Sequence, residues 1–343
     1  MTVTRSPHPM AGRHLALFLT RLMLPLLLLA STLVGLSETS MAETTRPGQD
    51  TPQSAPSTAR GSGHDSMVQR LRQLSFDCTS VRGQATRCIG RVPNYPQPVR
   101  IYVPENYVRT GQEPLALHFH GHNIAGSAES SHFVNGYGDF ETWLANSGSR
   151  QLLVIPTSTG NSSTYNSLFR PDSPRETGEN FNRFVSSLED VTGTSFNDLA
   201  LSGHSGAYAA IGALGLVPQD RPEGARVKQI SGIGLFDAVY GRSNQIMNWA
   251  NRLNTQRTLL YNLYAEPGST TSLVPNTGAR RYATGQLQLN EMASRIAQPR
   301  ARSADETLSG VQIRTENMDH MQAMMNGRYT DFLRNWSRLR SRP

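Results

Sequence analysis

Residues 198–216 read DLALSGHSGAYAAIGALGL, and this stretch decides the fold. The apolar run at 198–202 is typical of a buried strand, and the small-residue run at 207–216 is typical of a helix. Between the two, glycines flank Ser205 in a sharp strand-to-helix bend, where only small neighbours fit. Such a bend holds the serine above the edge of a sheet, in front of the free N–H groups of a helix N-terminus. The stretch predicts a nucleophile turn; the alternative is a plain small-residue break between two elements.

Apolar runs and helical patterns alternate on both sides of this turn. Near-continuous apolar strands that alternate with helices are typical of a parallel sheet covered by helices on both faces. We expect the earliest strands, around 88–92 and 99–103, to form an antiparallel edge. The other expected strands lie at 115–120, 152–156, 198–202, 232–236, 258–264 and 311–315, and the expected helices at 140–146, 179–191, 207–216, 244–253, 280–296 and 329–339. The sequence therefore predicts one α/β domain.

The N-terminal part of the chain reads as a targeting segment. Residues 1–42 have the layout of a secretory signal peptide, because arginines precede the apolar run 22–36 and small residues precede the expected cleavage site. An uncleaved membrane anchor is the alternative, but the run is short for a span of about 20 residues. Residues 43–65 are rich in Pro, Ser, Thr and Gly and predict a disordered linker. We expect a folded domain at 66–343, periplasmic or secreted, with no stable membrane span after cleavage.

Cysteine usage and charge narrow the classes of partner. Cys78 and Cys88 are the two cysteines of the sequence, and in an exported chain this spacing is typical of one local disulfide. The formal net charge is +7. All basic residues but Lys228 are arginines, and they are scattered along the chain, which is typical of coding bias rather than of a nucleic-acid-binding surface. We expect no nucleic-acid partner, while weak attraction to an anionic cell envelope stays open.

From about residue 85 to 340 the chain resembles the α/β-hydrolase superfamily, whose members include serine esterases and lipases. Gly203-His204-Ser205-Gly206-Ala207 resembles the nucleophile elbow of that family, although Ala207 stands where a second glycine is usual. The resemblance implies a mostly parallel central sheet with helices on both faces, with Ser205 as the nucleophile. We expect no cofactor and no metal ion. We see no insertion long enough for a large cap domain.

The resemblance also implies a base and an acid. A serine hydroxyl is a poor nucleophile at neutral pH, so it needs a base. In the family the base follows the last strand, and His320 is the one histidine of nine that follows Ser205 in the sequence. Asp237 ends an expected strand and is our first choice for the acid that orients this base. Glu266, after the next strand, is the alternative.

A run of histidines surrounds the expected oxyanion hole. In the family, this hole takes one backbone N–H from the loop after an early strand and one from the residue after the nucleophile. The resemblance therefore implies His122 and Gly206 as donors, with Gly121 allowing close approach. His118, His120 and His122 also suggest a zinc cluster, but zinc hydrolases with such a run add an Asp-His pair and distant histidines. The other interpretation is that these rings pack below the site and hydrogen-bond the loop.

The polar loop at 157–178 leaves the same edge of the sheet. Tyr165 and Phe169 are candidates to contact a sugar or an aromatic ring, and Arg170 or Arg175 to contact a carboxylate; a disordered surface loop is the alternative. Without a cap, the site suits a polar ester or an acylated polymer, including a cell-envelope component. The predicted function is an exported serine hydrolase that cleaves carboxylic esters through an acyl-enzyme. A cell-wall amidase or peptidase with the same triad, or a non-catalytic envelope-binding protein, are the alternatives.

Overall fold

The computed structural model describes residues 62–80, 83–121, 139–158, 165–238, 245–246, 258–265, 311–316 and 320–340. All of these residues belong to one compact unit, Ser57–Pro343. The predicted signal peptide, the linker up to residue 61, the helix predicted at 280–296 and nearly all of that at 244–253 lie outside the described residues. Among the helices that are described, none is both long and apolar enough to span a bilayer.

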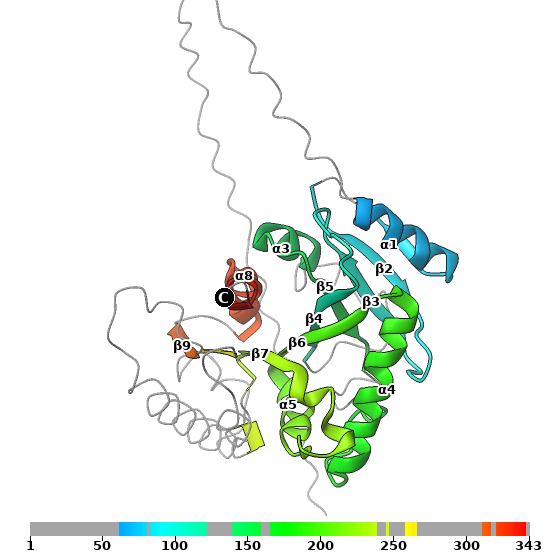
Figure 1. The fold of residues 1–343 in the computed structure, drawn as a ribbon. Coiled ribbons are helices and arrows are strands. Elements are labelled where there is room, and N and C mark those ends of the chain that lie inside the picture. Colours follow the sequence, from blue (N-terminus) through cyan, green and yellow to red (C-terminus); the bar gives the residue numbers. More distant parts are fainter. Residues whose placement is uncertain are drawn as a thin grey trace, which may run out of the picture. The chain divides into compact units, whose positions relative to one another are not determined.

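Within the described residues, a nine-stranded sheet forms the centre of the unit, in the order β1-β2-β3-β5-β4-β6-β7-β8-β9 (Figure 1). Neighbouring strands from β1 to β5 along this order pair antiparallel, and those from β5 to β9 pair parallel. This is the strand order of the α/β-hydrolase fold, so the predicted fold class and the antiparallel edge are confirmed. The strands are β1 (Asp77–Thr79), β2 (Thr86–Gly90), β3 (Val99–Val103), β4 (Gln112–Phe119), β5 (Leu152–Pro156), β6 (Ser195–His204), β7 (Ile230–Phe236), β8 (Leu259–Ala265) and β9 (Val311–Glu316).

Helices cover both faces of this sheet and enclose two apolar clusters (Figure 1). One face carries α1 (Ser62–Gln73), α4 (Pro174–Thr192) and α5 (Tyr208–Gly215), and the other carries α3 (Phe140–Ser147) and α8 (Arg328–Arg340). Short 3-10 helices occur at η1 (Ser205–Ala207), η2 (Pro222–Gly224), η3 (Val227–Gln229) and η5 (His320–Met324).

The sequence explains the bounds of the longest helix, α4. Ser173 caps its N-terminus by accepting a hydrogen bond from the Glu176 N–H, and Pro174 occupies the first turn, where no intrahelical N–H bond is lost. Gly193 ends the helix in the left-handed conformation. The buried side of α4 carries apolar residues at helical spacing, including Phe181, Phe184, Val185 and Leu188.

Most expected elements are present, with changes at their ends. The strands β3 and β5 have the predicted bounds, whereas β4, β6 and β7 begin two or three residues earlier than predicted. Polar residues such as Gln112 and Ser195 extend the hydrogen-bonded ladder at the amino ends of β4 and β6. Each of these two strands is therefore longer than its apolar run. The helix α1 was not predicted, and its first turn occupies residues 62–65, which the composition had placed in the linker.

The predicted disulfide joins Cys78 to Cys88 and is confirmed. The two residues lie directly opposite each other in the antiparallel pair of β1 and β2. The helix α1 lies against the same two strands. The disulfide therefore joins the two outermost strands at the antiparallel edge of the sheet. Three strands, β3, β5 and β4, separate this pair from β6.

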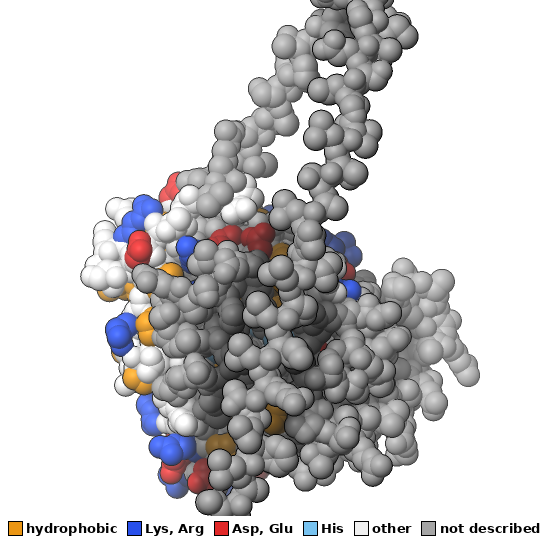
Figure 2. Space-filling view, turned by 180° about the vertical axis from the view of Figure 1, so that it is seen from behind, with side chains coloured by type: hydrophobic (Ala, Val, Ile, Leu, Met, Phe, Trp, Pro, Cys, Tyr) orange, Lys and Arg blue, Asp and Glu red, His pale blue; other side chains and the backbone are white. Residues whose placement is uncertain are grey.

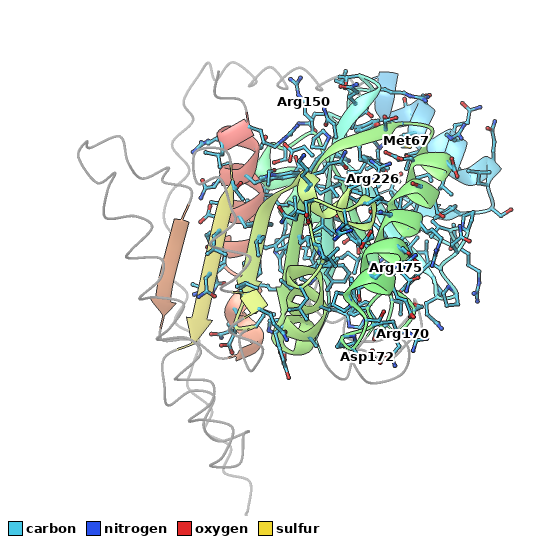
Figure 3. All side chains as sticks on the ribbon, turned by 60° about the horizontal axis from the view of Figure 1, so that its bottom comes forward. Met67, Arg150, Arg170, Asp172, Arg175 and Arg226 are labelled. Atoms are coloured by element: carbon cyan, nitrogen blue, oxygen red, sulfur yellow. A yellow bond between two sulfur atoms is a disulfide. The ribbon has the colours of Figure 1, made fainter. Side chains whose placement is uncertain are left out.

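The described surface that is visible in Figure 2 carries charged side chains of both signs. Basic, acidic and apolar side chains are interspersed there. Figure 3 shows the two ends of the parallel strands. Arg170 and Asp172 lie at the end toward which the arrowheads of β8 and β9 point, and Arg150 and Arg226 lie toward the other end.

Candidate active site

The strand β6 passes into α5 through a tight turn centred on Ser205. His204 is still extended, with φ −115° and ψ 141°, and Ala207 is already helical. Between them, Ser205 has a φ of 54°, a left-handed conformation that strains residues other than glycine. The strand–turn–helix geometry predicted from residues 198–216 is therefore present, with the strain located at the serine.

Glycine and alanine make this turn possible. A Cβ atom at Gly203 would lie 2.7 Å from the Ile211 Cδ1 and 2.8 Å from the Ala207 Cβ, so a side chain there would push α5 away from the strand. The Ala207 methyl group, at the position where the family more often has glycine, is fully buried, and its backbone is in the ordinary helical region. The departure from the family pattern therefore leaves the turn intact.

The loop after β4 lies directly against the turn. Phe119, the last residue of β4, pairs with Gly203 of β6, so Gly121 lies level with Ser205. A Cβ atom at Gly121 would be 2.7 Å from the Ser205 Cβ and 3.1 Å from the His204 carbonyl oxygen. Glycine is needed here because the two backbones approach this closely. His122, the expected oxyanion donor, lies outside the described residues.

Asp237 lies at the end of the next strand. Phe236 of β7 pairs with His204 of β6, so Asp237 is level with Ser205, one strand spacing of about 4.8 Å away along the sheet. Its backbone N–H donates to the Leu263 carbonyl oxygen of β8 at 2.7 Å, and its side chain is fully buried. Like Ser205, it has a positive φ, here 43°. Two strained residues therefore stand side by side at the carboxyl ends of β6 and β7.

The remaining candidates for the triad follow β8 and β9. Glu266 comes directly after β8 and lies outside the described residues. The strand β9 pairs parallel to β8, with Glu316 opposite Ala265, and His320 is the first residue of η5 a few residues later. The backbone of His320 therefore follows a strand that ends at the same rim as β6 and β7, and its side chain is not among those described. The triad contact itself stays a prediction.

His118 is buried on the face of the sheet that carries α3 and α8. Its ring packs against Phe140 and Tyr329, with ring centroids 5.1 and 5.4 Å away. Its Nδ1 lies 3.0 Å from the Ser202 Oγ, which is 3.2 Å from the Tyr329 hydroxyl. Burial, and secondarily the neighbouring histidines at 204 and 120, hold the pKa of His118 well below its usual 6.5. The ring is therefore neutral, and it packs below the site as the second interpretation of the histidine run predicted.

His120 lies just beyond the end of β4 and is also buried. Its Nδ1 is 2.9 Å from the Gly121 carbonyl oxygen, and its Nε2 accepts a hydrogen bond from the Ser158 N–H at 3.1 Å. For His120, then, the ring hydrogen-bonds the loop, as the second interpretation also predicted. Among the residues described, no three side chains of a metal-binding type are grouped closely enough to hold an ion.

The structure corrects the role predicted for the aromatic residues of the loop at 157–178. Tyr165 and Phe169 are buried and pack against Phe119, with ring centroids 5.1 and 5.3 Å away, so neither faces a substrate. The exposed guanidinium of Arg175 pairs with Glu179 of its own helix at 2.8 Å. The polar composition of the loop suggested a surface segment. Two aromatic residues four positions apart were the signal that its second half packs on the core.

Comparison with known proteins gives esterase structures of low similarity. No protein-family model and no curated protein matches the chain. The feruloyl esterase module from Clostridium thermocellum is 10% identical, with a TM-score of 0.43 over 75% of this chain and 89% of that one. A poly(3-hydroxybutyrate) depolymerase from Bordetella parapertussis is 15% identical (TM-score 0.40, 76% and 88% covered), and an S-formylglutathione hydrolase from Agrobacterium tumefaciens is 11% identical (0.41, 76% and 98%). These TM-scores are below 0.5, so the fold assignment rests on the strand order and register of this chain.

Proposed function

We propose that this chain is an exported serine hydrolase that cleaves carboxylic esters through an acyl-enzyme on Ser205. One observation carries the proposal: the strained serine at the tip of β6 faces a glycine loop so close that a Cβ at Gly121 would lie 2.7 Å from the Ser205 Cβ. Behind the serine, η1 and α5 present the N-terminus of a helix, whose free N–H groups favour a developing oxyanion.

In the proposed reaction, the Ser205 Oγ attacks the ester carbonyl while His320 takes its proton. The backbone amides of Gly206 and His122 hold the oxyanion of the tetrahedral intermediate. When the intermediate collapses, His320 returns the proton to the leaving alcohol and an acyl-serine remains. A water molecule, deprotonated by the same histidine, then attacks the acyl group and releases the acid and the free serine.

Asp237 is the better supported acid. Its buried carboxyl group starts level with Ser205, and the positive φ of Asp237 is the kind of strain that the fold maintains at functional positions. Glu266 is the alternative, one strand further along the sheet. We expect Asp237→Asn to lower kcat about 10⁴-fold while Glu266→Gln keeps most of the activity. The reverse result would assign the role to Glu266.

The experiment that tests the proposal uses the mature chain, a fluorophosphonate probe and a panel of acyl esters. We expect the probe to label the wild type and not Ser205→Ala, and ester turnover to fall about 10⁴-fold or more in that variant. Ser202→Ala, in β6 three residues before Ser205, is the matched control and should keep its labelling. Turnover that survives Ser205→Ala would refute the proposal, and an unlabelled wild type that binds envelope fragments would favour the non-catalytic binding protein.

The same assay separates the alternative bond types. An amidase or peptidase with the same residues would release amines from cell-wall fragments at a kcat/KM above that for any ester in the panel. Export is tested independently by expressing the full chain and sequencing the N-terminus of the accumulated protein, which we expect to begin after residue 42.

A further inference from the structure

We propose that His120 is a positioning residue whose ring fixes the peptide group leaving Gly121, and so aims the amide that would hold the oxyanion. The inference deepens the proposed function and rests on it. His120 would act through the backbone of the loop rather than on the substrate.

The contacts of the His120 ring determine where its proton lies. A carbonyl oxygen only accepts, so the Nδ1 that is 2.9 Å from the Gly121 carbonyl must donate. A backbone N–H only donates, so the Nε2 that is 3.1 Å from the Ser158 nitrogen must accept. The ring is therefore the neutral Nδ1–H tautomer, with both nitrogens engaged. Because Ser158 follows β5, this one side chain joins the carboxyl ends of two neighbouring parallel strands.

A second side chain holds the backbone on the other side of His120. The His120 N–H donates to the Tyr165 hydroxyl at 2.7 Å, and that hydroxyl lies 3.4 Å from the His120 carbonyl oxygen, to which it donates. Tyr165 is itself fully buried against Phe119 and has a φ of 48°. Such a strained conformation persists when the surrounding structure determines it. Three backbone polar groups of residues 120–121 are thus held by two buried side chains.

Peptide geometry connects these contacts to the proposed oxyanion hole. A trans peptide is planar, so its C=O and the N–H of the next residue point in opposite directions. When the His120 ring holds the Gly121 carbonyl, the amide that follows is aimed the other way. The Cα of Gly121 lies next to the nucleophile, because a Cβ added there would be 2.7 Å from the Ser205 Cβ. Donors that are already oriented need no reorganisation when charge develops, and this is the main source of their catalytic effect.

The expected effect is therefore on kcat rather than on KM, because the oxyanion exists only beyond the ground state. A misplacement of the donor by about 1 Å costs on the order of 100-fold. We expect His120→Leu, which removes both ring bonds, to lower kcat about 10- to 100-fold with KM changed less than about threefold.

Two conservative variants separate positioning from packing. Asn places an amide N–H about where Nδ1 stands, so His120→Asn can still donate to the Gly121 carbonyl. Gln places its amide about where Nε2 stands, so His120→Gln can still accept from Ser158 and loses the Gly121 bond. We expect His120→Asn to regain most of the kcat lost in His120→Leu, and His120→Gln to regain little of it.

His64 provides a matched control at the antiparallel edge. It is also buried, with Nε2 2.9 Å from the Thr86 Oγ1 and Nδ1 2.9 Å from the Asp65 carboxylate. His64→Leu should lower the unfolding midpoint and leave kcat of the folded fraction unchanged.

The outcomes are distinguishable from failure of the proposed function. If fluorophosphonate does not label the wild type and Ser205→Ala keeps its turnover, the proposed function fails. If labelling and turnover depend on Ser205 but His120→Leu keeps the wild-type kcat, the inference on His120 is overturned. The inference also fails if His120→Asn and His120→Gln lose activity equally, because only the Gly121 bond distinguishes them.

Discussion

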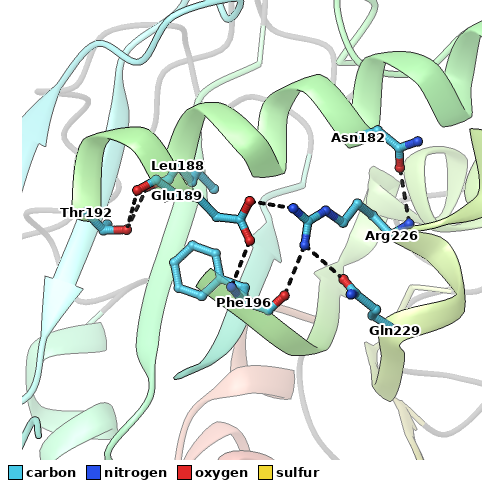
Figure 4. A network of polar contacts seen from close by, with 7 residues as sticks. All are labelled: Asn182, Leu188, Glu189, Thr192, Phe196, Arg226 and Gln229. Atoms are coloured by element: carbon cyan, nitrogen blue, oxygen red, sulfur yellow. Dashed lines mark hydrogen bonds and ion pairs between the residues drawn. The ribbon is translucent and has the colours of Figure 1, made fainter. Parts of the chain in front are cut away.

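The parallel strands of this sheet have two ends of opposite character. At the amino end of β6, a network of charged and polar groups joins α4, β6 and η3 (Figure 4). Glu189 of α4 accepts the Phe196 N–H at 2.8 Å and pairs with Arg226, whose guanidinium also donates to the Phe196 carbonyl oxygen at 3.0 Å and to the Gln229 side chain at 3.2 Å. At the carboxyl end, Ser205 and Asp237 have strained backbones beside buried neutral histidines.

A second hydrogen-bond network at the amino end connects α8 to β6 and β7. Asp198 of β6 accepts hydrogen bonds from the Ser231 hydroxyl and from Arg340 of α8. The Trp336 Nε1 of α8 donates to the same Ser231 hydroxyl at 2.8 Å. Here charges and hydrogen bonds hold the helices to the sheet, whereas the carboxyl end keeps conformations that cost free energy. One end stabilises the fold, and that stability maintains the strain at the other.

The strongest test of this difference uses one glycine from each end of β4. Gly121→Ala would place a methyl group 2.7 Å from the Ser205 Cβ, so we expect kcat to fall about 100-fold or more. Gly111 precedes β4 and has a φ of 88° with no atom near the added Cβ. Gly111→Ala should cost about 1 kcal/mol of stability and leave kcat unchanged. Steady-state kinetics and urea unfolding of both variants check this, and equal loss of kcat in the two would contradict it.

Breaking the amino-end network should affect stability alone. Glu189→Ala removes the partner of Arg226 and the acceptor of the Phe196 N–H. Because both side chains keep 17–19% exposure, we expect a loss of about 2 kcal/mol, less than for a fully buried pair. The exposed pair of Arg175 and Glu179 is the control, and Glu179→Ala should leave the urea midpoint unchanged. A fall in kcat of folded Glu189→Ala would show that the two ends are coupled.

The buried ring of His118 predicts that the free energy of unfolding depends on pH. The pKa of His118 is lowered in the folded protein, so below pH 6.5 the unfolded chain binds a proton that the folded chain does not. This contribution to stability is complete above pH 6.5 and is lost as the pH falls toward the folded pKa, by up to about 1.4 kcal/mol per pH unit. His118→Asn should reduce the slope of unfolding free energy between pH 6.5 and 5. An unchanged slope would refute the assignment.

The smallest expected effect measures the strain at the nucleophile turn. Ser205→Ala keeps a Cβ at the φ of 54°, whereas Ser205→Gly removes it. We expect both variants to be inactive and the glycine variant to be more stable than the alanine variant by about 1 kcal/mol. Urea unfolding of the two inactive variants gives this difference directly. Equal stabilities would mean that the turn stores no free energy.

The sequence predicted those elements well whose buried residues form a continuous apolar run. The strands β3 and β5 are buried on both faces, so their apolar runs match their bounds. The helix α1 was missed because its buried side offers few apolar residues, Met67, Val68 and Leu71, within a polar and charged segment. The strand β1 is three residues long and mostly exposed, so it has no alternation of apolar and polar residues by which the sequence could predict it.

The candidate site also has parts that the local sequence predicted and parts that it did not. The sequence predicted the tight turn at Ser205 and the close approach at Gly121, because each requires small residues within a few positions of the chain. The contacts of His120 with Ser158 and Tyr165 were not predicted, because they join residues 38 and 45 positions apart. They depend on β4 and β5 being neighbours, which no local pattern shows. Tyr165 also sits in a polar loop, where composition favours exposure.

The placement of η3 has a practical consequence. Lys228, the one lysine of the sequence, is exposed in this turn directly before β7. The seven residues of β7, at about 3.3 Å each, put it roughly 20 Å from Asp237. With the N-terminal amine blocked, amine-directed coupling to a bead or a sensor chip would therefore attach the protein through the Lys228 side chain alone, at the end of the sheet opposite to Ser205 and Asp237.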